Sequence, residues 1–436
     1  MNDTSSVSDR RFRPADADGV REVVAWATAE GEPLEVLGTG SKRALGRPVK
    51  AAHILDLSAL TGVEDYEPAE LVLTAKAATP IAEVEALLAE NGQEFAFEPM
   101  DYGSLLGGES GRGMLGVNLA GPKRLKHGAA RDHVLGIHAV SGRGEAFKSG
   151  GTVVKNVTGY DLSRGLAGSW GSLAVTTLLS LKVLPALETE ATVMIEGLAD
   201  APAVDALCLA MGTSAEACAA AHLPAGLGAS LGLEVAATLI RLEGFSPSVD
   251  YRFEALAALM KRLGSVSHIE ADASRALWRG IRDVRPFCGD ALPVWRISVT
   301  PMAGAEVVVA IRQTCSADAF YDCSGGLVWL RMSDGEPHEA DVRGAIGKVG
   351  GGHATLVRAE PSVRSSVPVF QPQDPALAAL SRRLKAQFDP AGILNPGRMR
   401  PEVKWCVSSR GNGAGKEALA MKRDGLFTRA ADPQQQ

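Results

Sequence analysis

Three glycine-rich stretches carry most of the side chains that could do chemistry in this chain. They are residues 38–42 (GTGSK), residues 113–122 (GMLGVNLAGP) and residues 150–171 (GGTVVKNVTGYDLSRGLAGSWG). Glycine has no Cβ, so its backbone can approach a ligand closely and adopt positive φ. Clustered backbone N–H groups beside hydroxyls and a cation are typical of loops that bind phosphate oxygens. The pattern therefore indicates a site for a large polar ligand, although composition alone is equally compatible with glycine-rich surface loops.

A basic segment follows the second glycine-rich stretch. It contains Lys123, Arg124, Lys126 and His127, with Arg131 shortly after. Such a cluster beside a glycine loop could hold a pyrophosphate, and a solvated basic turn is the alternative interpretation. Residues 111–116 match G-x-G-x-x-G by letters, but no convincing strand precedes them, so this match carries no weight.

Short apolar runs must position these loops. Residues 34–37 form a strand-like run that leads into GTGSK, and the runs 134–140 and 174–183 flank the third stretch. With the helical period of residues 17–27 and 81–89, they predict a first α+β or α/β domain. After Pro185 the composition shifts towards alanine and valine, and residues 190–359 alternate between strand and helix patterns. Two β-α-β-like passes of this kind predict a ferredoxin-like layered domain, with helices on one face of an antiparallel sheet.

Composition excludes several function classes. A chain of 436 residues favours two or three domains, and a net charge of −6 gives no reason to expect nucleic acid as a partner. None of the six cysteines forms a C-x-x-C pair, so no zinc or iron–sulfur site is predicted locally. The N-terminus does not resemble a secretory signal, and no run approaches the ~20 apolar residues of a membrane span. We predict a cytoplasmic protein, and peripheral association with the inner membrane stays open.

Five stretches in this order resemble the flavoprotein superfamily of vanillyl-alcohol oxidase type, whose FAD-binding domain is named after p-cresol methylhydroxylase (PCMH). They are residues 36–42 (VLGTGSK), 113–122, 131–136 (RDHVLG), 154–171 and 388–397 (FDPAGILNPG). Within that superfamily the sequence resembles the FAD-binding subunits of bacterial glycolate oxidases, in residues 38–49 (GTGSKRALGRPV), 119–124 (LAGPKR) and 351–358 (GGHATLVR). Each motif is weak alone, and five in the right order are specific.

The resemblance implies an α+β fold, with a PCMH-type FAD-binding domain over residues 14–187 and a ferredoxin-like α+β cap domain over 188–375. A C-terminal helix and turn, residues 376–400, would return to the flavin domain. We expect residues 1–13 to form a mobile arm and residues 401–436 to form a disordered tail.

The resemblance also implies cofactor-binding residues. The first loop would wrap the FAD pyrophosphate, the second would continue around the cofactor, residues 131–136 would lie near the adenine and ribose, and the third stretch would line the flavin. The candidates, in that order, are Gly38, Thr39, Gly40, Ser41 and Lys42; Gly113, Asn118 and Gly121; Arg131, Asp132 and Gly136; and Asn156, Gly159, Tyr160 and Asp161. Relatives often have Gly-Gly where this chain has Arg112-Gly113. No His, Cys or Tyr stands in the first loop, so we expect non-covalent FAD.

The implied function is that of the FAD-binding subunit of a glycolate oxidase complex, which oxidises glycolate to glyoxylate. Its partners would be a larger flavoprotein subunit and an iron–sulfur subunit that takes the electrons onward. His127, His133, His138 and His353 do not form the metal-ligand set of related 2-hydroxy-acid dehydrogenases, so no metal and no catalytic residue is assigned.

Two alternatives stay open. One is a scaffold subunit without redox function, against which the intact glycine loops argue. The other is a self-sufficient FAD-dependent 2-hydroxy-acid or alcohol dehydrogenase, which would need cations for the substrate carboxylate. Arg279, Arg282, Arg285 and Arg296 are the candidates, with surface charges on helices as the simpler interpretation.

Overall fold

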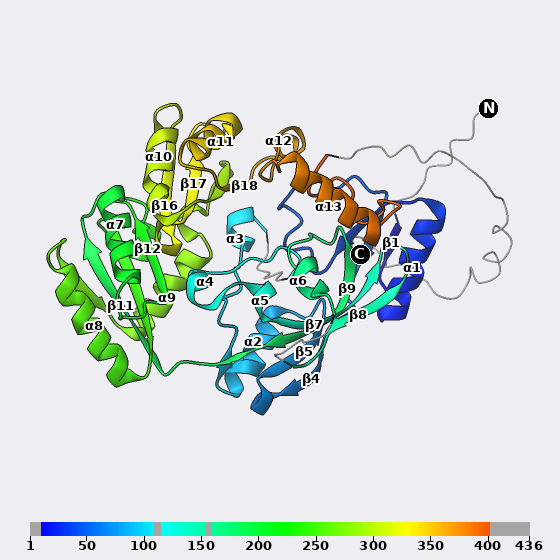
Figure 1. Cartoon of the computed structure of the whole chain (residues 1–436), viewed down its shortest axis with the longest axis horizontal. Helices are drawn as coiled ribbons and strands as arrows, with labels where there is room; N and C mark the ends of the chain where they lie inside the picture. The colour runs from blue at the N-terminus through cyan, green and yellow to red at the C-terminus, as the bar shows by residue number, and fades with distance from the viewer. Residues whose placement is uncertain (1–9, 109–114, 154–158, 402–436) are drawn as a thin grey trace, which may run out of the picture.

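The computed structural model describes residues 10–108, 115–153 and 159–401 of the chain. These residues form two α+β halves that lie side by side (Figure 1). The first half contains a parallel sheet of order β1-β3-β2 and an antiparallel sheet of order β4-β5-β9-β7-β8. Its strands are β1 (Arg10–Phe12), β2 (Leu34–Leu37), β3 (His53–Asp56), β4 (Val63–Glu67), β5 (Val72–Lys76), β7 (Val134–Ser141), β8 (Ala146–Gly150) and β9 (Ala174–Lys182), and β6 (Gln93–Glu94) pairs with β10 (Leu184–Pro185).

The helices of the first half follow the predicted apolar periodicity where they are long. In α1 (Ala17–Glu30), Val20, Val23, Val24 and Ala27 are buried, as the spacing predicts. Asp16 caps its N-terminus by accepting a hydrogen bond from the N–H of Gly19, and Gly31 ends it at φ 71°. The other helices are α2 (Ile81–Glu90), α3 (Gly103–Leu106), α4 (Arg124–His127), α5 (Ala130–His133) and α6 (Leu162–Leu166).

The second half is built on one eight-stranded antiparallel sheet of order β14-β11-β13-β12-β16-β17-β15-β18. It consists of two βαββαβ units, each with the ferredoxin-like strand order 4-1-3-2, joined where β12 meets β16. Each of the two predicted β-α-β-like segments is thus part of a full βαββαβ unit with four strands and two helices. The first contains β11 (Thr189–Glu196), α7 (Asp200–Met211), β12 (Ala219–Leu223), β13 (Ala237–Gly244), α8 (Ser246–Met260) and β14 (Val266–Ile269), and the second contains β15 (Val294–Ser298), α10 (Gly304–Arg312), β16 (Ala317–Asp322), β17 (Leu327–Met332), α11 (Glu339–Lys348) and β18 (His353–Arg358).

The two faces of the large sheet have different neighbours. Helices α7, α8, α10 and α11 pack on one face, as the ferredoxin-like prediction requires. On the other face, a core that includes Trp329 of the sheet and Trp278 of α9 (Ala271–Arg282) also contains Tyr102 of the first half. The rings of Tyr102 and Trp329 meet edge to face with centroids 5.9 Å apart. One apolar core therefore connects the two halves.

After α12 (Pro361–Ser366) and α13 (Pro375–Phe388), the chain crosses back to the first half. There the N–H of Leu34 donates to the carbonyl of Ile393 at 2.8 Å, and the N–H of Asn395 donates to the carbonyl of Leu34 at 3.0 Å. The C-terminal turn thereby extends the parallel sheet beside β2.

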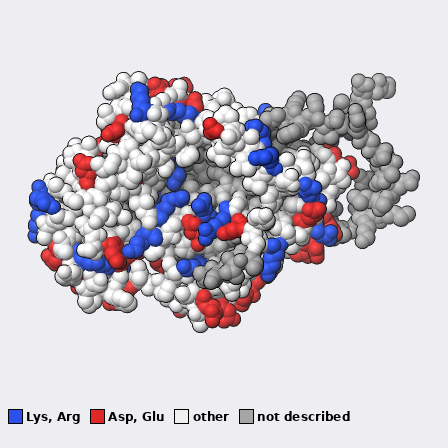
Figure 2. Space-filling view, in the orientation of Figure 1, with Lys and Arg blue, Asp and Glu red and all other residues white. Residues whose placement is uncertain are grey.

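On the face drawn in Figure 2, charges of both signs are interspersed among the described residues. Several Lys and Arg side chains border the hollowed area between the two halves. Within the described ranges, we find no helix with the length and apolar character needed to cross a bilayer.

Candidate functional site

A cavity of about 480 Å³ opens in the first half. It is bounded by the loop after β2, the end of β5 with the start of α2, part of β9, and the C-terminal turn. All five predicted residues of the first loop line it, namely Gly38, Thr39, Gly40, Ser41 and Lys42.

The first loop has the properties of an anion-binding nest. Within the described part of the chain, the backbone N–H groups of Thr39, Gly40 and Ser41 have no hydrogen-bond partner. Gly40 has φ +80°, and a Cβ there would meet open space. Lys42 is buried, and its ammonium lies 5.3 Å from the centre of the Tyr102 ring. Unpaired backbone donors facing a cavity beside a cation suit phosphate oxygens.

Asn395 of the C-terminal turn connects this loop to the third glycine-rich stretch. Its Oδ1 accepts a hydrogen bond from the N–H of Val36 at 2.8 Å, and its Nδ2 donates to the carbonyl of Trp170 at 2.8 Å. Asn395 adopts φ +44°, a conformation that asparagine tolerates better than most residues. A single buried amide thus positions two walls of the cavity.

Arg398 holds the backbone at the end of the first loop, residues 38–42. Its guanidinium donates to the carbonyls of Lys42 at 2.8 Å and Arg43 at 3.2 Å, and it stacks over the ring of Trp170. Burial lowers the pKa of this guanidinium to about 10. The sequence motif at residues 388–397 was identified, but the roles of Asn395 and Arg398 were not predicted. Both residues bind backbone groups that lie far away in the sequence. The Asn-Pro-Gly turn was the available signal.

Asp389 shapes the turn that carries these two residues. Its carboxylate accepts hydrogen bonds from the N–H groups of Ile393 at 3.1 Å and Leu394 at 2.9 Å, and it pairs with the ammonium of Lys385. Lys385 also donates to the carbonyl of Ser172 at 2.5 Å. The motif is therefore a rigid turn held to the third stretch.

The second loop contributes to the cavity through its first described residues. Leu115, Gly116 and Val117 line it, and the carbonyl of Gly116 accepts from the N–H of Trp170 at 2.9 Å. Asn118 lies outside the lining, where its Oδ1 accepts from the N–H of Arg131 at 2.9 Å. At Gly121 a Cβ would come within 2.8 Å of the Glu98 Cβ, so this glycine permits close packing. The predicted Gly113 falls outside the described residues.

Residues 131–136 do not line the cavity either. Asp132 caps α5 by accepting from the N–H of Ala129 at 3.0 Å, and Arg131 is exposed beside it. Gly136 lies where two strands run close, since a Cβ there would be 2.6 Å from the carbonyl oxygen of Gly151. The structure gives these residues local roles, and their contact with a ribose stays a prediction.

The third stretch lines the cavity with its C-terminal end, through Leu166, Ser169, Trp170 and Gly171. Its predicted flavin residues lie elsewhere. Tyr160 is 88% exposed, and Asp161 caps α6 by accepting from the N–H of Arg164 at 3.2 Å. Gly159 has φ +93° and is not part of the lining, while Asn156 falls outside the described residues. A role at the flavin stays a prediction for all four.

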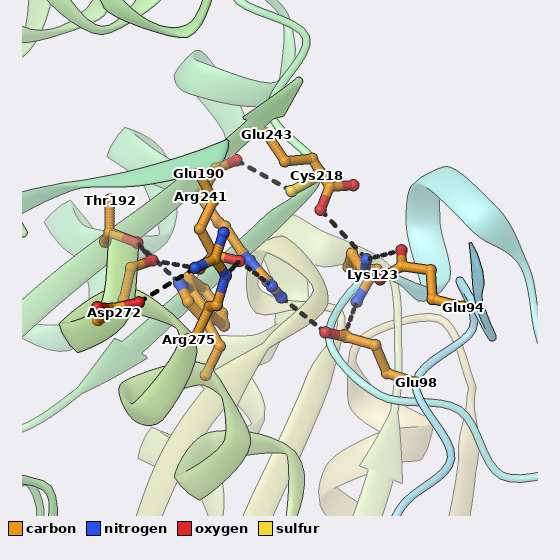
Figure 3. Close-up of polar contacts among 12 residues, drawn as sticks. Glu94, Glu98, Lys123, Glu190, Thr192, Cys218, Arg241, Glu243, Asp272 and Arg275 are labelled. Carbon is orange, nitrogen blue, oxygen red and sulfur yellow. Dashed lines mark hydrogen bonds and ion pairs between the residues drawn. The ribbon is translucent and has the colours of Figure 1, made fainter. Parts of the chain in front are cut away.

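At Lys123 the basic segment is neither a pyrophosphate site nor a solvated turn. The Lys123 side chain is 3% exposed, and its ammonium lies 2.9 Å from Glu94 and 3.1 Å from Glu243 (Figure 3). Its backbone N–H donates to Glu98 at 3.1 Å. Its charge is thus matched by carboxylates, which excludes it as a phosphate ligand. The basic segment alone could not show this, because the carboxylates that pair with Lys123 lie far away in the sequence.

These contacts belong to a charged network between the halves. Arg241 of β13 joins Glu98 at 2.6 Å to Glu190 of β11 at 2.5 Å (Figure 3). Burial alone would raise the pKa of the Glu243 carboxyl, but the hydrogen bond from His127 and the charges of Lys123 and Arg241 outweigh it and lower that pKa to about 2. The network holds the first half against the sheet that covers it.

Of the four arginines considered for a substrate carboxylate, three are exposed or paired. Arg279 and Arg285 are exposed, and Arg282 pairs with Asp283 at 2.7 Å. Arg296 differs, because its Nε is buried and has no partner among the described residues. Burial lowers the pKa of the nearby Arg124, and the positive charge of Arg296 lowers it further.

Comparison with known proteins connects this geometry to two profiles and several relatives. The profile described as FAD binding domain matches residues 9–150, and that described as FAD linked oxidases, C-terminal domain, matches residues 369–399. The chain is 34% identical over 385 residues to the glycolate oxidase subunit GlcE of Escherichia coli, covering 88% of this chain and 97% of that protein. It is 24% identical over 435 residues to the glycolate oxidase subunit GlcD of Bacillus subtilis, covering 90% and 89%.

The structure of p-cresol methylhydroxylase with bound substrate superimposes with a TM-score of 0.62 at 14% identity, covering 89% of this chain and 88% of that one. At this identity the likeness shows the fold, and it confirms the predicted PCMH-type α+β architecture.

Proposed function

The chain belongs to the family of FAD-linked oxidases that includes the glycolate oxidase subunit GlcE, and from this we propose that it is the FAD-binding subunit of a glycolate oxidase complex. Family membership makes it an FAD-dependent oxidoreductase acting on CH–OH donors. In the proposed complex glycolate is oxidised to glyoxylate. A larger flavoprotein subunit and an iron–sulfur subunit would be its partners, and the complex would sit peripherally at the inner membrane.

The single observation that carries the assignment of the site is the nest of residues 39–41 facing the cavity. Thr39, Gly40 and Ser41 offer backbone donors that are unpaired within the described ranges, and the buried Lys42 adds a cation. These groups fit the two phosphates of FAD. We propose that they hold the pyrophosphate without a covalent bond, while Asn395 and Arg398 fix the loop that presents them.

When bound, FAD supplies the acceptor for the electrons of the donor alcohol. The protein's own contribution is binding and orientation. We propose the boundaries 14–187 and 188–375 for the flavin and cap domains, with residues 376–400 returning to the first. Part of the predicted mobile arm belongs to the first domain as well, because β1 (Arg10–Phe12) pairs with β3. The remaining predicted residues stay proposed cofactor contacts, namely Gly113, Asn118, Gly121, Arg131, Asp132, Gly136, Asn156, Gly159, Tyr160 and Asp161.

A self-sufficient 2-hydroxy-acid dehydrogenase is the second candidate, and one observation favours it. The positive charge of Arg296 acts on Arg124, whose pKa it lowers together with burial. The buried Nε of Arg296 has no hydrogen-bond partner among the described residues. Two such cations suit a substrate carboxylate.

The first experiment measures glycolate-dependent dye reduction by the chain purified alone, with flavin content determined from the visible spectrum. Bound flavin without turnover supports the accessory subunit. Bound flavin with turnover would replace it by the self-sufficient enzyme, and a colourless protein that resists reconstitution would favour the scaffold.

A double variant tests the site itself. Lys42→Ala combined with Asn156→Ala should lower FAD occupancy without unfolding the protein, and Lys126→Ala serves as the matched control on an exposed lysine. Full FAD retention in the double variant would refute the site assignment.

A further inference from the structure

A cysteine, a histidine and an aspartate meet in the second βαββαβ unit, away from the residues that line the cavity. Cys315 lies in the turn between α10 and β16, His338 is the N-cap of α11, and Asp341 lies in the first turn of that helix. Their potential ligand atoms all lie within 4.8 Å of one another. Cys315 is buried and the other two are half-buried, so these groups are not simply solvated surface charges.

The imidazole of His338 is held on both sides. Its Nε2 lies 2.7 Å from Oδ2 of Asp334, and its Nδ1 lies 3.7 Å from Oδ2 of Asp341. If Nε2 donates its proton to Asp334, Nδ1 carries a lone pair directed at a carboxylate oxygen. Two ligands bound to one tetrahedral zinc ion at about 2.0–2.1 Å are separated by roughly 3.4 Å, close to the spacing of Nδ1 and Asp341. A carboxylate on the other imidazole nitrogen is the usual outer partner of a metal-bound histidine.

Two further features fit this arrangement. His338 adopts φ 45° and ψ 45°, a left-handed conformation that histidine adopts only occasionally, and its side chain makes no capping hydrogen bond to α11. A shallow surface cavity lined by residues 312–317 gives access to the thiol.

We propose that Cys315, His338 and Asp341 form a binding site for one zinc-class divalent transition metal ion. Asp334 orients His338, and a water molecule occupies the fourth position. On binding, the Cys315 thiol loses its proton to solvent and the thiolate bonds to the ion. The ion would tie the turn before β16 to the start of α11. The site is independent of FAD, so its test does not depend on the proposed function.

The same distances have a metal-free explanation, in which a protonated imidazole lies between Asp334 and Asp341. Cobalt titration of the chelator-treated full chain distinguishes the two. The proposal expects saturable binding of one Co²⁺ per chain, a near-ultraviolet thiolate-to-cobalt absorption band, tetrahedral visible bands, and displacement of cobalt by one equivalent of Zn²⁺. Saturating Zn²⁺ should also raise the unfolding temperature.

The variants make the assignment specific. Cys315→Ser should abolish the thiolate band, and Asp334→Asn should weaken Co²⁺ binding by about 10–100-fold. Cys218→Ser, at a buried thiol near Arg241, is the matched control and should leave both signals unchanged. Asp341→Asn provides a second ligand variant if Cys315→Ser fails to fold. Absence of saturable binding, a cobalt spectrum without the thiolate band, or an unchanged band in Cys315→Ser would each overturn the proposal in favour of the protonated imidazole.

Discussion

Replacing Lys123 by methionine should destabilise the protein strongly, because its ammonium is the positive centre of a buried cluster. Methionine keeps much of the apolar stem and removes the charge. The Glu243 side chain is 8% exposed, so it has little access to water that could replace the ammonium. In the variant, Glu98, whose side chain is 15% exposed, would keep its ion pair with Arg241 and lose the nearby positive charge of Lys123.

The cost of leaving a buried charge without its partner gives the magnitude. Removing one partner of a buried ion pair costs about 3–5 kcal/mol, because a charge is left uncompensated. The pKa of Glu243 falls from 4.5 to about 2, a difference that corresponds to about 3 kcal/mol of interaction between its charged form and all of its surroundings, of which Lys123 supplies a part beside His127 and Arg241. Lys126 is the matched control. Its side chain is 41% exposed and lies 3.4 Å from Glu216, itself 70% exposed, so Lys126→Met should cost less than about 1 kcal/mol.

Urea unfolding followed by tryptophan fluorescence measures the effect. Trp278 reports on this region, since its indole donates to Thr192 beside the network. With a slope of about 3 kcal/mol/M, a loss of about 3–5 kcal/mol lowers the urea midpoint by roughly 1–1.7 M. The double variant Lys123→Met with Glu243→Gln should recover part of the loss, because the uncompensated carboxylate is gone. A midpoint for Lys123→Met equal to that of Lys126→Met would refute the argument that the buried charge matters.

The remaining predictions concern the same interface and the cavity. The lowered pKa of Glu243 contributes stability that is complete above the unfolded-state pKa of 4.5 and is lost as the pH falls towards about 2, so the urea midpoint should drop below pH 4.5 and Glu243→Gln should flatten that limb. Asn395→Ala removes two hydrogen bonds at the cavity and should weaken FAD binding about tenfold or more by flavin fluorescence titration, whereas Asn91→Ala, at an exposed helix end, should leave it unchanged. Thr192→Val leaves the buried Trp278 indole without its acceptor and should cost about 1–3 kcal/mol in the same urea assay; a cost below ~0.5 kcal/mol would contradict it.

The sequence predicted elements whose side chains repeat regularly and missed those that depend on distant partners. The buried face of α1 followed from the spacing of Val20 to Ala27. The sequence of β12, AAAHL, is buried at every position and shows no alternation, so its pattern alone could not identify it as a strand. The first glycine loop was found because its donors and its cation are neighbours in the chain.

The role of Lys123 could not be found locally. Its partners Glu94 and Glu243 lie 29 and 120 residues away, and nothing in the basic segment itself distinguishes a buried lysine from a solvated one. The role of Asn395 could not be predicted for the same reason, because its hydrogen-bond partner Val36 lies 359 residues away in the sequence. A pattern within one segment indicates the secondary structure and burial of that segment. The roles of Lys123 and Asn395 depend instead on contacts between segments that are far apart in the sequence.

The two βαββαβ units are joined at a single seam, the antiparallel pairing of β12 with β16. The strand order reads the same outward from the seam in both directions, so a pseudo-twofold axis passes near the pair His222 and Tyr321. Asp200 lies at the seam and accepts from the Tyr321 hydroxyl at 2.7 Å. Two separate copies of one unit, paired in this way, would form a homodimer that dissociates on dilution. Because both units belong to one polypeptide, the seam is maintained at any protein concentration, and its two halves are free to diverge in sequence.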